Sequence, residues 1–441
     1  MKNEFLKLLR EKENEIIQNS IELINIPSIT VNRKECERAL RFVIENMKSE
    51  GLQTYYTKDM DCGVVELGEG EETLGILTHV DVVDIGDLEK WNTKPFDAQK
   101  KDGFIIGRGA VDDKCPTVII MTILNVLNSL NLKYKRKVQF IVGTSEEEEW
   151  TDIKSYKNEF TPPNFGFTPD GEFPVYNIES GYADVILEFV VDTDTNFGIV
   201  KVMESGNSSN TIPSAGTLQI IKKGQDFHFD FKGKSSHSSL PENGNNALIK
   251  MCKWLVENSE MDTSLKNAID LILLMDNCYY GDTLGFDNLD LYINEDYIGK
   301  NIVNPTILKL EGNKLTLNIN IRQRFGVTKD DINKVFKKLS DEYEFDYRFT
   351  GGFLDPLYVN SNNPVFEKMN TVYEEVTKNK GGFQLTRGTS YAKALPNSVC
   401  WGPLLEGEED TCHQENEKMS VESIIKCVEI YGSFIYDMLV E

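Results

Sequence analysis

The chain has 441 residues, of which 40% are apolar and 27% charged; this excludes a disordered, collagen-like or disulfide-dense protein and favours two or three globular domains. It carries 71 acidic against 47 basic side chains, a net charge of -24 at neutral pH. A surface this acidic repels phosphate backbones and anionic lipids, so nucleic acids and membrane surfaces are poor partners.

The compartment can be inferred from the termini and the cysteines. The first residues lack a basic stretch followed by an apolar one, and the longest apolar stretch, around 118–127, is interrupted by Thr122 and Asn125. Neither a signal peptide nor a membrane helix is therefore expected. Eight cysteines without a C-x-x-C pair indicate free thiols in a reducing compartment. We expect a cytoplasmic protein.

The N-terminal part of the chain has the apolar spacing of helices. Residues 4–24 predict one amphipathic helix closed by Pro27, and residues 36–49 predict another. Short apolar runs then alternate with polar turns and helices. They lie at 74–78, 104–106, 138–142 and 398–401, with a helix opened by Pro116 between the second and third. This order predicts an α/β fold, a mostly parallel sheet with helices on both faces.

From about residue 182 the pattern changes. It predicts strands at 183–191, 226–231 and 315–321, and helices near 245–257 and 328–340. Helices over 364–378 and 420–439 accompany a return to the α/β pattern. We therefore expect a discontinuous first domain, residues 1–181 and 354–441, interrupted by an inserted α+β domain, residues 182–353.

Potential metal ligands follow five predicted strands, the four runs above and one that ends at Phe167-Thr168, near the carboxyl ends where open α/β sheets bind ligands. They are His79, Asp81, Asp112, Glu146, Glu147, Asp170 and His413. His79 and Asp81 are two residues apart, so on an extended segment both point to one side. The carboxylate can then hold one imidazole nitrogen while the other binds metal.

Each of these residues also has a simpler interpretation. An H-x-D tripeptide is commonly a capped turn, and either Asp112 or Asp113 could cap the following helix. The run from Glu146 to Glu149 is typical of solvated surface. Taken together, however, two of the four histidines in the chain and three carboxylates can hold two divalent ions, with one carboxylate bridging.

Six segments, in this order and spacing, resemble the aminoacylase, carnosinase and acetylornithine deacetylase family of dinuclear metallohydrolases. They are LTHVDVV, GRGAVDDK, GTSEEEEW, GFTPDGEFP, GKSSHSSLPENGNNA and DTCHQENE. Within that family the chain is most similar to the bacterial dipeptidase V type, the Xaa-His dipeptidases. The resemblance extends over nearly the whole chain.

The resemblance implies a catalytic domain that holds two divalent ions, Zn²⁺ or Mn²⁺, with Co²⁺ also suited to the ligands. The implied ligands are His79 and Asp170 for one ion, His413 and Glu147 for the other, and Asp112 as the bridge. Asp112 is assigned rather than Asp113 because the bridging Asp of the family stands two residues before Lys. Glu146 is then the general base, and Asp81 orients His79.

The inserted domain resembles the lid of this family. His237 matches the histidine that closes over the site and polarises the scissile carbonyl, whereas Asn210 and Arg322 match substrate-binding positions. Members with long lids resemble monomers in which the insert does the work that a partner subunit does in shorter ones. We therefore expect a monomer.

Several positions depart from the family pattern. Arg387 stands where a small residue is usual, Lys393 replaces an Arg, and Cys115 replaces a Gly. These changes leave the substrate preference open. Cys115 and Cys412 each lie within a few residues of an implied ligand, so oxidation of either could disturb the site; packing into the protein interior is the alternative.

The implied activity is metal-dependent hydrolysis of dipeptides with a free C-terminus. A metal-bridging water, activated by Glu146, would attack the peptide carbonyl while Arg322 binds the substrate carboxylate. The alternative is removal of an acetyl or succinyl group from an amino acid by the same metals. A more remote alternative is a catalytically silent peptide-binding homologue, whose expected signature is a lost base or ligand. In each case the expected partner is a small peptide or amino-acid derivative.

Overall fold

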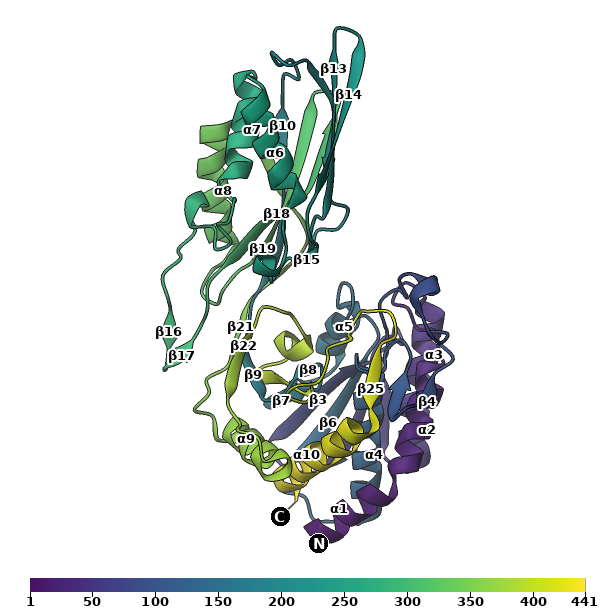
Figure 1. The fold of residues 1–441 in the computed structure, drawn as a ribbon. Helices are drawn as coiled ribbons and strands as arrows, with labels where there is room; N and C mark the ends of the chain where they lie inside the picture. The colour runs from purple at the N-terminus through teal and green to yellow at the C-terminus, as the bar shows by residue number, and fades with distance from the viewer. Residues whose placement is uncertain (441) are drawn as a thin grey trace. The chain divides into compact units, whose positions relative to one another are not determined.

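The computed structural model describes residues 1–440, and the chain divides into two compact units (Figure 1). Unit 1 comprises residues 1–177, 359–384 and 390 to the end of the chain, and unit 2 comprises residues 178–358 and 385–389. The limits of the long insert lie within a few residues of those expected from the sequence. Residues 385–389 also belong to unit 2, although they come after the long insert in the sequence. The sequence did not predict this.

Unit 1 is built on one large sheet with the strand order β1-β2-β6-β3-β7-β23-β9. These strands are β1 (Gln53–Tyr56), β2 (Gly63–Gly68), β6 (Lys137–Gly143), β3 (Thr73–His79), β7 (Phe165–Thr168), β23 (Ser398–Trp401) and β9 (Val175–Glu179). The four central strands, β6, β3, β7 and β23, run parallel, and the flanking pairs are antiparallel. Two further strands, β21 (Leu357–Tyr358) and β22 (Phe383–Thr386), pair with β9.

Helices cover both faces of this sheet, as the α/β pattern predicts. The helices of unit 1 are α1 (Lys2–Glu11), α2 (Glu13–Ile24), α3 (Arg33–Ser49), α4 (Lys114–Ser129), α5 (Thr151–Glu159), α9 (Pro364–Thr377) and α10 (Val421–Leu439). On one face α4 packs between α3 and α10. On the other, Ile153 and Tyr156 of α5 pack with Leu77 and Ile141 of the sheet in one buried apolar cluster. Burying each such side chain contributes roughly 1.5–3 kcal/mol.

Two details of the predicted order are wrong. The helix expected over 4–24 is two helices, because the chain turns at Lys12, whose N–H bonds to Leu9 O instead of continuing the α-helical ladder. The run 104–106 is a strand, β5 (Phe104–Ile106), but it lies outside the large sheet. It forms a small antiparallel sheet with β4 (Gln99–Lys101) and β25 (Lys418–Ser420).

Unit 2 is an α+β unit in which α6, α7 and α8 pack on one antiparallel sheet (Figure 1). Its sheet contains, in spatial order, β14 (Gln225–Lys232), β13 (Ala215–Lys222), β11 (Ile199–Ser205), β18 (Ile302–Glu311), β19 (Lys314–Arg322), β10 (Tyr182–Val190) and β20 (Asp346–Leu354). The helices are α6 (Ala247–Asn258), α7 (Thr263–Leu273) and α8 (Lys329–Tyr343). A capping box between Thr328 and Asp331 begins α8.

Short strand pairs complete both units. They are β8 (Gly171–Glu172) with β24 (Pro403–Leu404) in unit 1, and β12 (Thr211–Ile212) with β15 (Ser236–His237) and β16 (Tyr292–Ile293) with β17 (Asp296–Tyr297) in unit 2. Within residues 1–440, no helix has both the length and the apolar character needed to cross a membrane.

Candidate metal centre

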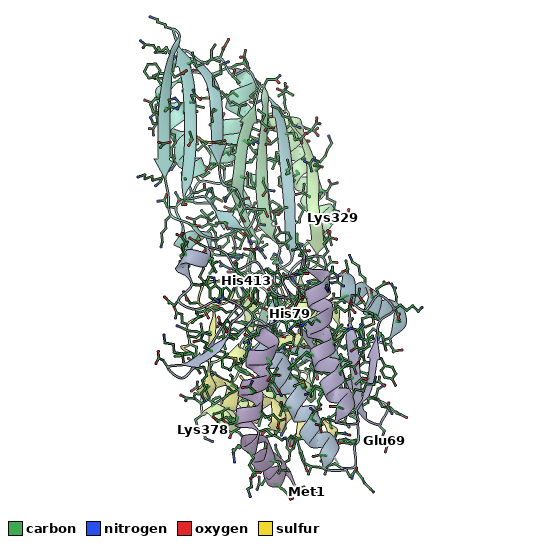
Figure 2. The ribbon with its side chains drawn as sticks, turned by 90° about the vertical axis from the view of Figure 1, so that its right-hand side faces the viewer. Met1, Glu69, His79, Lys329, Lys378 and His413 are labelled. Atoms are coloured by element: carbon green, nitrogen blue, oxygen red, sulfur yellow. The ribbon has the colours of Figure 1, made fainter. Side chains whose placement is uncertain are left out.

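The parallel strands of unit 1 bring the predicted ligands to one edge of the sheet. β3 ends at His79, which stands beside Gly143 at the end of β6. The loops that follow β6 and β7 carry Glu146 and Asp170 only two or three residues further on. Figure 2 shows His79 and His413 close together at the same end of unit 1.

Asp112 lies between the two histidines. Its Oδ1 is 2.8 Å from His79 Nε2 and its Oδ2 is 2.9 Å from His413 Nε2. The neighbouring Asp113 faces elsewhere, since its Oδ2 accepts the main-chain N–H of His79 at 3.3 Å. One carboxylate therefore faces both imidazoles with different oxygens, which is the arrangement of a bridging ligand.

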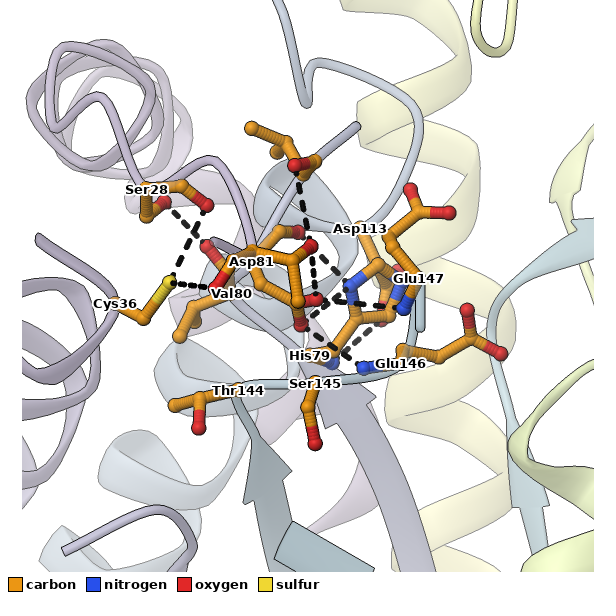
Figure 3. Close-up of polar contacts among 12 residues, drawn as sticks. Ser28, Cys36, His79, Val80, Asp81, Asp113, Thr144, Ser145, Glu146 and Glu147 are labelled. Atoms are coloured by element: carbon orange, nitrogen blue, oxygen red, sulfur yellow. Dashed lines mark hydrogen bonds and ion pairs between the residues drawn. The ribbon is translucent and has the colours of Figure 1, made fainter. Parts of the chain in front are cut away.

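Asp81 organises the loops on either side of His79. The Nδ1 atom of His79 is 3.0 Å from the main-chain oxygen of Asp81 and 3.4 Å from its Oδ1. The same carboxylate accepts the hydroxyl of Thr30 at 2.8 Å and the main-chain N–H groups of Glu146 and Glu147 at 3.2 and 3.3 Å (Figure 3). The ring of His79 and the glutamate loop are thus tied to one buried carboxylate.

The two glutamates diverge from adjacent main-chain positions (Figure 3). Glu147 Oε2 is 3.1 Å from His413 Nε2. Glu146 instead groups with His79 and Asp170, one potential ligand atom of each lying within 4.8 Å of the others. Glu146, for which the family resemblance implies the role of base, is therefore also within reach of an ion held by His79 and Asp170.

The cluster contains more carboxylates than positive charge, and this imbalance changes the pKa values. Burial, followed by the charge of Asp170, raises the pKa of Glu146 well above its usual range. Burial and the charge of Asp112 raise the pKa of Glu147 to about 7. Burial also raises the pKa of Asp112, but hydrogen bonds from His413 and His79 outweigh it and hold that pKa well below its usual range. Divalent cations would neutralise such a cluster.

The donors fit the metal ions that the sequence predicts. Imidazole nitrogens and carboxylate oxygens suit Zn²⁺, Mn²⁺ and Co²⁺. The buried Nε2 of His79 makes no hydrogen bond and faces two carboxylate oxygens, Asp112 Oδ1 at 2.8 Å and Asp170 Oδ1 at 4.0 Å. A divalent ion held by these three side chains would satisfy that nitrogen.

Sequence reasoning missed two residues that support the site, Asp152 and Tyr391, and noted only that Cys412 adjoins a ligand. Cys412 Sγ is 2.9 Å from Asp112 Oδ2, and with Asp112 and His413 it forms a second group of potential ligands. Cys115 differs, because it is fully buried in α4. Asp152 accepts the N–H groups of the residues just before the glutamates, and Tyr391 donates to Asp152 and contacts the ring of His79 edge-on. No local motif marks Asp152 or Tyr391.

The remaining predicted site residues belong to unit 2. His237 pairs with Thr211 across β12 and β15, and Asn210 O accepts the N–H of Ser238, so Asn210 and His237 are neighbours. Arg322, at the end of β19, is only 6% exposed, and its guanidinium lies 4.8 Å from the ring centre of Tyr182. Within residues 1–440 no carboxylate lies at ion-pairing distance from Arg322.

Comparison with known proteins agrees with this chemistry. A family model described as "Peptidase family M20/M25/M40" matches residues 75–437. "Putative dipeptidase YtjP" of Bacillus subtilis is 28% identical, with 98% of this chain and 99% of the relative covered. "Putative dipeptidase SAB1611c" of Staphylococcus aureus is 26% identical, with the same two shares covered.

Solved structures show the same fold at low sequence identity. Human carnosine dipeptidase 1 matches with a TM-score of 0.65 and 14% identity, over 99% of this chain and 98% of that one. Aminoacylhistidine dipeptidase from Vibrio alginolyticus matches with a TM-score of 0.63 and 11% identity, over 96% of each chain. The α/β architecture with a mostly parallel sheet is confirmed.

Proposed function

The chain belongs to peptidase family M20/M25/M40 and is a metallopeptidase, and from this premise we propose that it hydrolyses dipeptides with a free C-terminus. The observation that carries the proposal is the Asp112 carboxylate, which faces His79 with one oxygen and His413 with the other. Relatives named dipeptidases, matched over 98% of this chain, support the substrate class.

In this proposal two divalent ions share the cluster. His79 and Asp170 would hold one, His413 and Glu147 would hold the other, and Asp112 would contribute to both. Such ions, when bound, lower the pKa of water and polarise a carbonyl group. The donor types leave Zn²⁺, Mn²⁺ and Co²⁺ as candidates.

Glu146 is the proposed general base. Its main chain is held on two sides, by Asp81 through its N–H and by the indole of Trp150, which donates to its carbonyl oxygen at 2.7 Å. Desolvation by the surrounding protein, followed by the charge of Asp170, raises the pKa of the Glu146 carboxylate, and a higher pKa makes a carboxylate a stronger proton acceptor. Glu146 takes a proton from the attacking water and passes it to the leaving amine. Asp81 keeps the ring of His79 in position throughout.

Unit 2 supplies the proposed substrate contacts. His237 polarises the scissile carbonyl, and Asn210 and Arg322 bind the substrate. The buried guanidinium of Arg322 supports this role because a buried charge without a carboxylate partner is costly unless a ligand pairs with it. A substrate carboxylate matches the guanidinium fork and would select peptides that end one residue after the cut.

A substrate panel tests the proposal. We expect the protein, loaded with Zn²⁺ or Mn²⁺, to cleave a dipeptide and to leave the matching N-acetyl and N-succinyl amino acids intact. The C-terminal amide of the same dipeptide should react about 10- to 100-fold more slowly, because a hydrogen bond to a charged group contributes about 1.5–3 kcal/mol. Release of free amino acid measures each rate.

The outcomes separate the alternatives. Faster cleavage of the N-acyl amino acids would identify a deacylase instead. Binding of dipeptides without turnover, insensitive to chelators, would indicate a silent peptide-binding homologue. Arg322→Lys keeps the charge but loses the fork, so it should slow the dipeptide reaction and reduce the difference between the acid and its amide.

We also propose that the protein is a cytoplasmic monomer in which His237 serves its own chain. Its eight free cysteines suit a reducing compartment. Glu146→Ala and His237→Ala proteins should each be inactive, and mixing them should restore no activity, because neither chain has both residues. The mixture is assayed beside each variant alone at the same total concentration. Recovered activity would show that the histidine acts across a subunit interface.

A further inference from the structure

A further buried carboxylate, that of Glu417, contacts the loop that carries Asp112. Glu417, directly before β25, is 1% exposed and accepts four hydrogen bonds. Its Oε1 accepts the main-chain N–H groups of Val111 at 2.8 Å and Asp112 at 3.2 Å. Its Oε2 accepts the N–H of Gly109 at 2.9 Å and Nη1 of Arg108 at 2.8 Å. Glu417 thus binds the backbone of the loop that carries Asp112.

Arg108 extends this contact to the loop that carries His413. Its Nη1 also donates to the carbonyl oxygen of Gln414 at 3.1 Å, and its Nη2 donates to that of His413 at 3.4 Å. Nη2 reaches Asp84 O as well, at 3.1 Å, in the loop that follows His79 and Asp81. The side chain is 1% exposed and its guanidinium lies 5.4 Å from the ring centre of Trp91.

These contacts connect the backbones of residues on both sides of the cluster. We infer that Arg108 and Glu417 are positioning residues, in which Glu417 sets the loop of Asp112 and Arg108 holds the loop of His413 against it. The inference rests on the proposed metal centre and adds a device that neither the ligands nor the base provide. It predicts that loss of Glu417 lowers the affinity for both ions, through Asp112, whereas loss of Arg108 lowers mainly the affinity for the ion at His413.

An ion pair that served only to stabilise the fold would have a different effect. Its partners would not need to be the main-chain atoms of two ligands, and its loss would weaken both metal positions only in proportion to unfolding. Metal affinity measured on folded protein therefore separates the two roles. Residues that hydrogen-bond to a metal ligand and fix its orientation typically increase metal affinity or activity 10- to 100-fold.

The test uses two single variants, Glu417→Gln and Arg108→Lys, titrated with Zn²⁺ against a chromophoric chelator. In Glu417→Gln an amide N–H₂ replaces one acceptor oxygen and faces main-chain donors, so both ions should bind about 10- to 100-fold more weakly. Arg108→Lys keeps the buried charge but has a single side-chain nitrogen, which cannot reach Glu417 and all three carbonyl groups together. It should weaken one ion only.

Adding each change to His413→Ala identifies the ion. In that background, where the ion at His79 remains, Arg108→Lys should leave the affinity unchanged and Glu417→Gln should lower it. Phe5→Leu is the control for stability, because it removes buried contacts between α1 and Tyr436 of α10. It should lower the thermal midpoint without changing either affinity. If Glu417→Gln does not fold, Arg108→Lys carries the test, since it keeps the charges balanced.

The results that would overturn the inference are equally definite. Affinities within twofold of wild type in both variants, or an equal loss in Phe5→Leu, would reduce the pair to a structural ion pair. Equal loss of both ions in Arg108→Lys would contradict the division of roles. Wild-type protein that binds fewer than two ions would overturn the proposed centre itself, and the inference with it.

Discussion

Glu146→Gln protein is expected to bind two divalent ions as tightly as wild type and to hydrolyse dipeptides with kcat lowered about 10²- to 10⁴-fold, the contribution of a general base. Glutamine has the same shape as glutamate and keeps the main-chain contacts to Asp81 and Trp150, which involve only the backbone of residue 146. It cannot take a proton from water. Metal content after dialysis and kcat for a dipeptide measure the two expectations separately.

This variant decides between two roles, because the Glu146 carboxylate also lies within reach of an ion at His79 and Asp170. Loss of one ion together with activity would make Glu146 a ligand. Retention of more than a few per cent of kcat would show that another group is the base. Glu148→Gln is the matched control, since Glu148 is an exposed neighbour in the same acidic run, and it should leave both quantities unchanged.

Asp112→Ala is expected to lose both ions and all measurable turnover, whereas His413→Ala should lose only one ion. The difference follows from geometry. Each oxygen of Asp112 faces a different histidine, whereas His413 contacts Asp112 and Glu147 through a single nitrogen, Nε2. The number of ions bound per chain, measured by elemental analysis of dialysed protein, distinguishes the two results.

Two further variants serve as controls for this experiment. Asp84→Asn should keep both ions, because among residues 1–440 the Asp84 carboxylate bonds only to the N–H of Gly86. Cys412→Ala should also keep both, because the Cys412 thiol donates to Asp112 while His413, Glu147 and Asp112 remain to hold the ion. An Asp112→Ala protein that retained one ion at wild-type affinity would remove Asp112 as the bridge.

Much of the fold could be predicted because apolar periodicity is a local property of the chain. The helix expected over 364–378 matches α9, and the strand expected over 315–321 matches β19. Periodicity could not detect the turn at Lys12, because the apolar spacing continues across it and both helices bury apolar side chains, such as Phe5 in α1 and Ile16 in α2. Nor could it assign a three-residue strand such as β5 to a sheet, since that depends on its partners.

The candidate site was also partly predictable from the sequence and partly dependent on the tertiary structure. The sequence by itself predicted which residue types could bind metal, their order and the loops that carry them, because each motif consists of consecutive residues. Only the tertiary structure decided which atoms meet: that Asp112 rather than Asp113 faces both histidines, and that Glu146 and Glu147 point to different partners. It also brought together Arg108 and Glu417, which are 309 residues apart. Such pairs cannot be predicted from sequence spacing, because the packing of the whole domain decides which buried charges lie next to each other. Neither residue of the pair identifies the other by its place in the sequence.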